Sequence, residues 1–134
     1  GEVRTYDAEH GLRVHLLRPS ADHDLQAAPE RGCMAFLHGG AWMSGAPYQF
    51  YTHARSVAQD LGLTVACCEY RMLVTHPRAD LPFDAVEDAD RCVRFLRDRS
   101  QELRLDPQRF VLAGSSSGGH LAAITALENA ELDL

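Results

Sequence analysis

The stretch that decides the fold is Ala113–Ala122, which reads AGSSSGGHLA. It follows RFVLAG at 109–114, a short apolar run typical of a buried strand, and it leads into GHLAAITALENA at 119–130, an amphipathic helical pattern. A slack Gly/Ser linker has no reason to stand between a buried strand and a helix only a few residues apart. Two alternatives are left, a phosphate-binding loop and a sharp turn that presents one serine.

The phosphate-binding alternative is only partly matched. Gly114 and Gly119 have the spacing of a Walker A loop, but that loop continues with lysine and then serine or threonine. His120 and Leu121 occupy those positions, and the stretch contains no G-x-G-x-x-G dinucleotide pattern. We therefore expect no cofactor. The four cysteines form no CxxC motif and do not cluster with histidines at zinc-ligand spacing, so we expect no metal either.

The third alternative fits in one register. Gly114, Ser115, Ser116, Ser117 and Gly118 satisfy G-x-S-x-G, which between a strand and a helix predicts a nucleophile elbow. Such a turn holds its central residue in a strained conformation and requires small neighbours. We predict that Ser116 is the catalytic nucleophile and that the N–H of Ser117 helps to bind an oxyanion at the helix N-terminus.

A second motif stands earlier, at Leu37–Trp42, which reads LHGGAW. An ester-cleaving serine enzyme needs backbone donors opposite the elbow, and a glycine-rich loop after a buried strand can supply them. The alternative is a plain strand-to-helix turn, in which two glycines are common. With the elbow downstream, we predict that Gly39, Gly40 and Ala41 form an oxyanion hole. Trp42 either borders the substrate pocket or is a packing aromatic.

The rest of the chain alternates between strand and helix patterns. Two strands joined around Gly11 open the chain and are followed by buried strands and apolar-striped helices. The expected elements are strands at 33–38, 63–70 and 109–114 and helices at 47–62, 81–103 (ended by Asp106-Pro107) and 119–130. Such alternation predicts an α/β fold, a mostly parallel sheet with helices on both faces.

With both motifs placed, HGGAW, ACCEYR, LPFDAVEDADRCVRFLR and LDPQRFVLAGSSSGGHLAA together resemble the α/β-hydrolases of the hormone-sensitive-lipase and acetyl-esterase-like (feruloyl-esterase-like) group. The resemblance implies a three-layer fold and a serine carboxylic-ester hydrolase acting through an acyl-enzyme on Ser116, on a small-molecule ester. It also implies that Glu69-Tyr70-Arg71 and Asp88 are scaffold residues. Two alternatives stay open, an amide hydrolase like the kynurenine formamidases and a non-catalytic binding protein.

The resemblance also implies that residues 1–134 are the N-terminal part of a single domain, truncated after the nucleophile helix. In the family the triad acid and histidine follow the serine, and only a helix follows Ser117 here. We expect the local histidines and carboxylates to be poor substitutes: His120 points into the scaffold, His38 orients the loop, His53 and His76 are solvated, and Asp84, Asp88 and Asp90 serve helix capping and the helix dipole. The chain alone should be inactive and should expose a strand edge.

Composition excludes several classes of protein. The 134 residues are 46% hydrophobic and carry a net charge of −6, so there is enough apolar material for a core and no basic stripe for nucleic acid. No apolar run reaches the ~20 residues of a membrane span. We expect the four cysteines to be buried and reduced, and the protein to be cytoplasmic. The sequence does not indicate an oligomeric state.

Overall fold

A computed structural model describes residues 2–130. The chain opens with strands β1 (Glu2–Asp7) and β2 (Leu12–Leu17), which pair antiparallel. Gly11, in the turn between them, has a φ of 66°, a left-handed conformation that suits glycine. The two strands predicted around this glycine are confirmed.

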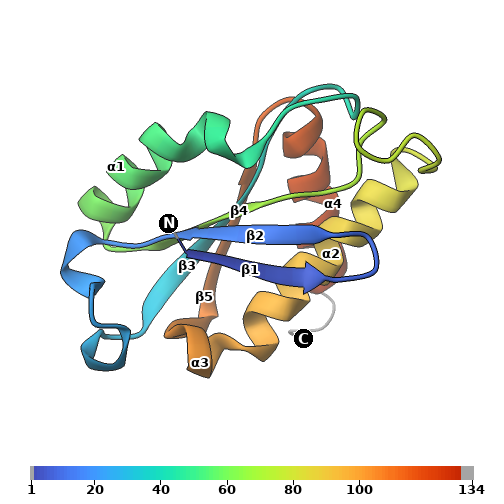
Figure 1. Ribbon diagram of the computed structural model, residues 1–134. Coiled ribbons are helices and arrows are strands. Elements are labelled where there is room, and N and C mark those ends of the chain that lie inside the picture. Colours follow the sequence, from blue (N-terminus) through green and yellow to red (C-terminus); the bar gives the residue numbers. More distant parts are fainter. Residues whose placement is uncertain (1, 131–134) are drawn as a thin grey trace.

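The remaining elements follow in the predicted alternation (Figure 1). They are the short turns η1 (Ser20–Asp22) and η2 (Leu25–Ala27), then β3 (Arg31–Leu37), η3 (Pro47–Phe50), α1 (Tyr51–Leu61), β4 (Thr64–Cys68), α2 (Phe83–Asp98), α3 (Ser100–Leu103), β5 (Leu105–Gly114) and α4 (Ser117–Ala130). The sheet order is β1-β2-β4-β3-β5. β4 and β5 both run parallel to β3, whereas β2 is antiparallel to β4. The α/β fold class is confirmed.

Helices cover both faces of this sheet, with α1 on one side and α2 and α4 on the other (Figure 1). The alternation of side chains along β4 sorts its residues between the two layers. Val65 and Cys67 belong to the cluster that contains Ala54 and Ala58 of α1. Ala66 and Cys68 belong to the larger cluster, which contains the buried residues of α2. The three-layer arrangement is therefore present.

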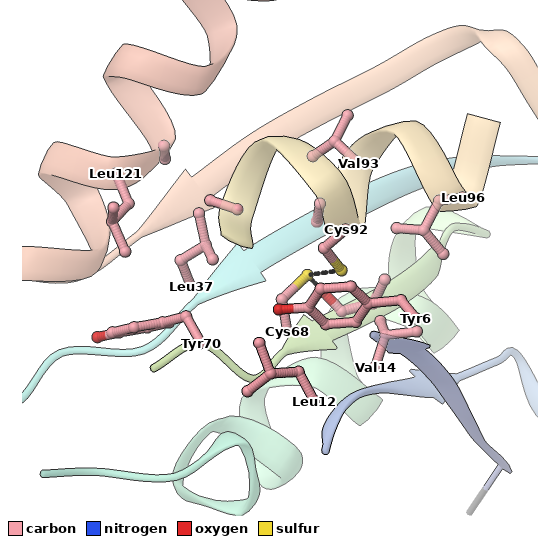
Figure 2. Close-up of a cluster of buried hydrophobic side chains, with 14 of the residues drawn as sticks. Tyr6, Leu12, Val14, Leu37, Cys68, Tyr70, Cys92, Val93, Leu96 and Leu121 are labelled. Atoms are coloured by element: carbon pink, nitrogen blue, oxygen red, sulfur yellow. Dashed lines mark hydrogen bonds between the residues drawn. The ribbon is translucent and has the colours of Figure 1, made fainter. Parts of the chain in front are cut away.

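The larger cluster buries the apolar stripe that was predicted for 81–103. Every member of that stripe is buried: Ala85, Ala89, Cys92, Val93, Leu96 and Leu103. Figure 2 shows Cys92 of α2 directed toward Cys68 of β4. The predicted single helix is in fact two, because α2 ends at Asp98 and α3 forms a separate turn. The predicted helix 47–62 likewise begins with the 3₁₀ turn η3.

The strand before the serine motif differs from its prediction in two ways. β5 begins at Leu105, so Asp106-Pro107 lies inside the strand, beside a register shift opposite Arg31 and Cys33 that accommodates the proline. Within residues 2–130 the strand is also not buried, since it forms an edge of the sheet and Val111 is 51% exposed. The exposed strand edge was predicted correctly.

All four cysteines are buried free thiols, as expected. Within residues 2–130, no helix combines the length and the apolar character that crossing a bilayer would need.

Candidate active site

The corner between β5 and α4 places Ser116 in a left-handed backbone conformation, with a φ of 54°. A serine in this region is strained, and such strain persists only where the surroundings enforce it. The side chain of Ser116 is exposed, whereas Ser117, the first residue of α4, is buried. The corner therefore presents the middle serine to solvent at the N-terminus of a helix.

The glycines that flank the serines are required by close backbone contacts. A Cβ atom on Gly114 would lie 2.2 Å from the carbonyl oxygen of Gly118. A Cβ atom on Gly118 would lie 1.9 Å from the oxygen of Leu37 and 2.5 Å from that of His38. The N–H of Ser115 donates to the same Leu37 oxygen at 3.3 Å. The corner is thus packed directly on the end of β3. The segment that follows β3, residues 38–42, is called the HGG loop below.

The HGG loop lies against the serine corner although more than 70 residues separate them in the sequence. A Cβ atom on Gly39 would be 2.9 Å from the carbonyl oxygen of Ser115 and 3.4 Å from the Cβ of Ser116. After Gly39 the loop runs through three positive φ values, 137° at Gly40, 54° at Ala41 and 65° at Trp42. The structure therefore brings together the two motifs that the sequence placed apart.

This conformation leaves backbone donors near the corner. The N–H groups of Met43 and Ser44 donate to the Gly40 carbonyl at 3.0 and 3.2 Å. Within residues 2–130, the N–H groups of Gly40 and Ala41 donate to no backbone carbonyl. Unpaired donors of this kind, with the N-terminus of α4 beside them, can bind a negatively charged oxygen.

His38 orients the HGG loop through a hydrogen bond, as expected. Its Nδ1 lies 2.8 Å from the Gly39 oxygen, so this nitrogen carries the hydrogen and donates. Burial lowers the pKa of His38, and the ring is therefore neutral at pH 7. The ring also stacks on Tyr70, with centroids 4.5 Å apart and planes 16° from parallel.

Two residues that support the loop were not predicted from the sequence to do so. The hydroxyl of Tyr70 donates to the His38 oxygen at 2.6 Å. Gly45 has a φ of 114°, and a Cβ there would lie 2.4 Å from the Gly39 oxygen. The Ser44-Gly45 pair is an ordinary turn signal that could have indicated the glycine. The pairing of Tyr70 with His38 has no local sequence signal, since the two residues are 32 positions apart.

Trp42 is half-buried and packs against the larger core cluster. Its ring makes edge contacts with Tyr70 and His120, at centroid distances of 6.4 and 5.7 Å. His120 is exposed, so the expectation that it points into the scaffold was wrong. The first turn of α4 directs this side chain outward, over Trp42.

The other histidines and carboxylates lie outside the corner. His53 is exposed, as expected, but the Nε2 of His76 donates to the His10 oxygen at 2.8 Å, so His76 is not simply solvated. Asp88 is fully buried in an ion pair with Arg71, which agrees with the scaffold role that the resemblance implied and corrects the capping and dipole role expected for it. Within residues 2–130, no hydrogen bond joins the Ser116 hydroxyl to a histidine.

A possible metal-ligand group elsewhere is formed by Asp7, Glu9 and His10 in the β1–β2 turn. Arg91 binds the Asp7 carboxylate at 2.6 Å and the Nδ1 of His10 binds it at 2.8 Å. This carboxylate already has charged and polar partners, and we assign no metal to it.

A strand, a strained serine corner and a helix, facing a glycine loop at the end of a neighbouring parallel strand, define an α/β-hydrolase. The sequence supports this class, because the family model BD-FAE matches residues 24–134. The chain belongs to the BD-FAE family.

Solved structures and curated proteins agree with this assignment. The propionate-bound esterase Est2 of Thermogutta terrifontis superposes with a TM-score of 0.81 and 34% identity, covering 91% of this chain and 43% of that one. The ethyl acetate hydrolase of Pseudomonas putida is 34% identical over 87% of this chain and 35% of its own length. A probable isoprenylcysteine alpha-carbonyl methylesterase of Oryza sativa is 36% identical over 72% of this chain and 22% of its own. The chain thus spans about a third or less of these curated relatives.

Proposed function

We propose that this chain is part of a single-domain serine carboxylic-ester hydrolase and supplies its nucleophile and oxyanion hole. The observation that carries the proposal is the left-handed Ser116, exposed at a helix N-terminus and packed against Gly39. The relatives named above support ester hydrolysis, since their names describe esterases.

The reaction follows from the roles proposed for these residues. The Ser116 oxygen attacks the ester carbonyl carbon and gives up its proton to a base, and the carbonyl oxygen becomes an oxyanion. The N–H groups of Gly40, Ala41 and Ser117 stabilise that oxyanion, while Gly39 leaves room for it. Collapse of the intermediate expels the alcohol, which takes up a proton, and leaves an acyl group on Ser116. Water then releases the acid.

The base is the part of this reaction that the described residues do not supply. Without a base the hydroxyl of Ser116 is a weak nucleophile. We therefore expect the 134-residue chain alone to hydrolyse p-nitrophenyl acetate at a negligible rate. Turnover by this chain that disappears in Ser116→Ala would contradict that expectation.

A fluorophosphonate probe tests the nucleophile in the full protein, because it labels only an activated serine. We expect one label on Ser116, which Ser116→Ala removes and Ser115→Ala leaves. A protein that stays unlabelled while folded would favour the non-catalytic binding alternative. Comparing short acyl esters with N-formylkynurenine separates the ester hydrolase from the formamidase alternative.

Trp42 is proposed to border the substrate pocket, since its ring lies between Tyr70 and His120 beside the corner. If it does, Trp42→Leu should change the ratio of kcat/KM for acetate and butyrate esters of the same alcohol. An equal loss for both esters would assign Trp42 to packing alone.

A further inference from the structure

The pair Cys68 and Cys92 is not used by the proposed reaction. Their Sγ atoms lie 3.0 Å apart, in the middle of the larger core cluster (Figure 2). Cys68 is the last residue of β4 and Cys92 lies in the middle of α2, and the two side chains are 1% and 0% exposed. A disulfide bond is ~2.05 Å long, so a shift of about 1 Å separates the two thiols from a covalent link.

The contact is specific to these two cysteines. Cys67, the neighbour of Cys68 on β4, faces the opposite side of the sheet and packs in the cluster of α1. Cys33 belongs to the same cluster as Cys68 but lies on β3. Within residues 2–130, the contact between Cys68 and Cys92 is the one that joins two thiols.

We propose that Cys68 and Cys92 form a disulfide when the chain folds in the presence of a low-molecular-weight disulfide such as oxidised glutathione. In the unfolded chain, one cysteine thiolate attacks the glutathione disulfide and releases one glutathione thiolate. The second cysteine thiolate then attacks the protein sulfur of the mixed disulfide and releases the second. The two cysteines each lose a proton, and two electrons pass from the cysteine sulfurs to the oxidant.

The folded, reduced protein resists the same reaction. Only a thiolate attacks a disulfide. The contact with Cys92 and burial raise the pKa of the Cys68 thiol far above its usual range, and neither sulfur is accessible to glutathione. The redox state of the pair is therefore set while the chain folds and is kept afterwards.

The crosslink would join two elements that support the site. β4 leads into Tyr70, which donates to the carbonyl of His38, and α2 carries Asp88, which binds Arg71. A bond between them closes a loop of 24 residues. For a loop of this size in the longer single domain proposed above, we expect the oxidised form of the full protein to melt roughly 5 °C higher than the reduced form.

The test compares two treatments of the full protein. One sample is unfolded in urea and refolded with a mixture of oxidised and reduced glutathione, and the other is treated with the same mixture while folded. Alkylation of free thiols, followed by peptide mapping, then identifies any linked pair. We expect a peptide joining Cys68 to Cys92 in the refolded sample and free thiols at both positions in the sample kept folded.

Two variants sharpen the result. Cys67→Ala is the matched control, equally buried and one residue away, and it should form the same bond. Cys92→Ala should leave Cys68 alkylated. The proposal is overturned if refolded wild-type protein has both cysteines alkylated, or if Cys68 is linked to Cys33 instead. The peptide map of the refolded wild-type protein decides whether Cys68 and Cys92 are linked, even if a variant fails to fold.

Discussion

Arg71 and Asp88 form a buried ion pair. The Arg71 Nε lies 2.9 Å from Oδ2 and its Nη2 lies 2.9 Å from Oδ1, while the backbone N–H of Arg71 donates to Oδ2 at 2.9 Å. Asp88 is 0% exposed. The pair fixes the segment after β4 to α2. Since this segment includes Tyr70, the ion pair also supports the HGG loop indirectly.

Asp88→Asn should be destabilising, because it keeps the shape of the side chain but removes the fully buried charge that binds Arg71. Within residues 2–130, this leaves the arginine only Asp84 as an ion-pair partner, 3.4 Å from its Nη1. We expect a loss of about 3 kcal/mol in the free energy of unfolding, measured by urea titration. Glu87→Gln is the control, since Glu87 binds Arg91 at 3.2 Å but its side chain is 62% exposed. It should cost less than ~1 kcal/mol. Equal losses in the free energy of unfolding would show that the buried ion pair stabilises the protein no more than the exposed one.

Two adjacent glycines allow a test of the serine corner. A Cβ on Gly118 would lie 1.9 Å from the Leu37 oxygen, whereas one on Gly119 would lie 3.3 Å from the Gly114 oxygen. Gly118→Ala must push the corner away from β3, and we expect a loss of ~3 kcal/mol in stability together with loss of fluorophosphonate labelling. Gly119→Ala should change stability by less than ~1 kcal/mol, because alanine favours the helix. Normal labelling of Gly118→Ala would contradict the packing described here.

His38 should make stability depend on pH. Burial lowers its pKa in the folded state, so the unfolded chain takes up the proton first as the pH falls below about 6.5. The contribution of neutral His38 to the free energy of unfolding is therefore complete above that pH. It is lost as the pH falls toward the pKa of His38 in the folded state. We expect a lower Tm at pH 5.5 than at pH 7.5, and a smaller difference in His38→Asn, whose amide can still donate to Gly39. His53→Asn, the same substitution at an exposed position, is the matched control.

The sequence predicted the parts of this molecule that depend on local pattern. The alternation of strands and helices and the register of G-x-S-x-G around Ser116 could all be read from it. The start of β5 was misjudged because Asp106-Pro107 is an ordinary signal for the end of an element, and the register shift that admits the proline depends on the pairing of β5 with β3. The capping role expected for Asp88 was wrong because its partner Arg71 is 17 residues away, whereas the scaffold role came from the resemblance. In a sequence that predicts a helix, a polar residue that faces solvent cannot be distinguished from one that forms an ion pair in the core.

Sequence reasoning predicted that His38 orients the loop, but it had no means to find that Tyr70 supports His38. His38 and Tyr70 come from the ends of β3 and β4, which are neighbours only because the sheet pairs them in parallel. Once the sheet order is known, both residues lie at the carboxyl edge, where the site of an open α/β sheet is expected. The motif residues and the role of His38 could therefore be predicted from the sequence, whereas the contact of Tyr70 with His38 required the fold.

Tyr70→Phe tests whether this support matters for the reaction. The change removes one buried hydrogen bond, from the Tyr70 hydroxyl to the His38 oxygen, and keeps the ring that stacks on His38. We expect ~1–2 kcal/mol less stability, because the His38 carbonyl loses its partner in the core. In the full protein, kcat for a short acyl ester should fall roughly tenfold with little change in KM. This is less than the 10²–10³-fold loss in kcat that follows removal of a direct oxyanion donor.

Tyr48→Phe, at a position that is 68% exposed, should change neither stability nor kcat. An unchanged kcat in a destabilised Tyr70→Phe would limit Tyr70 to a role in folding, because a displaced oxyanion loop must raise the barrier of the acylation step.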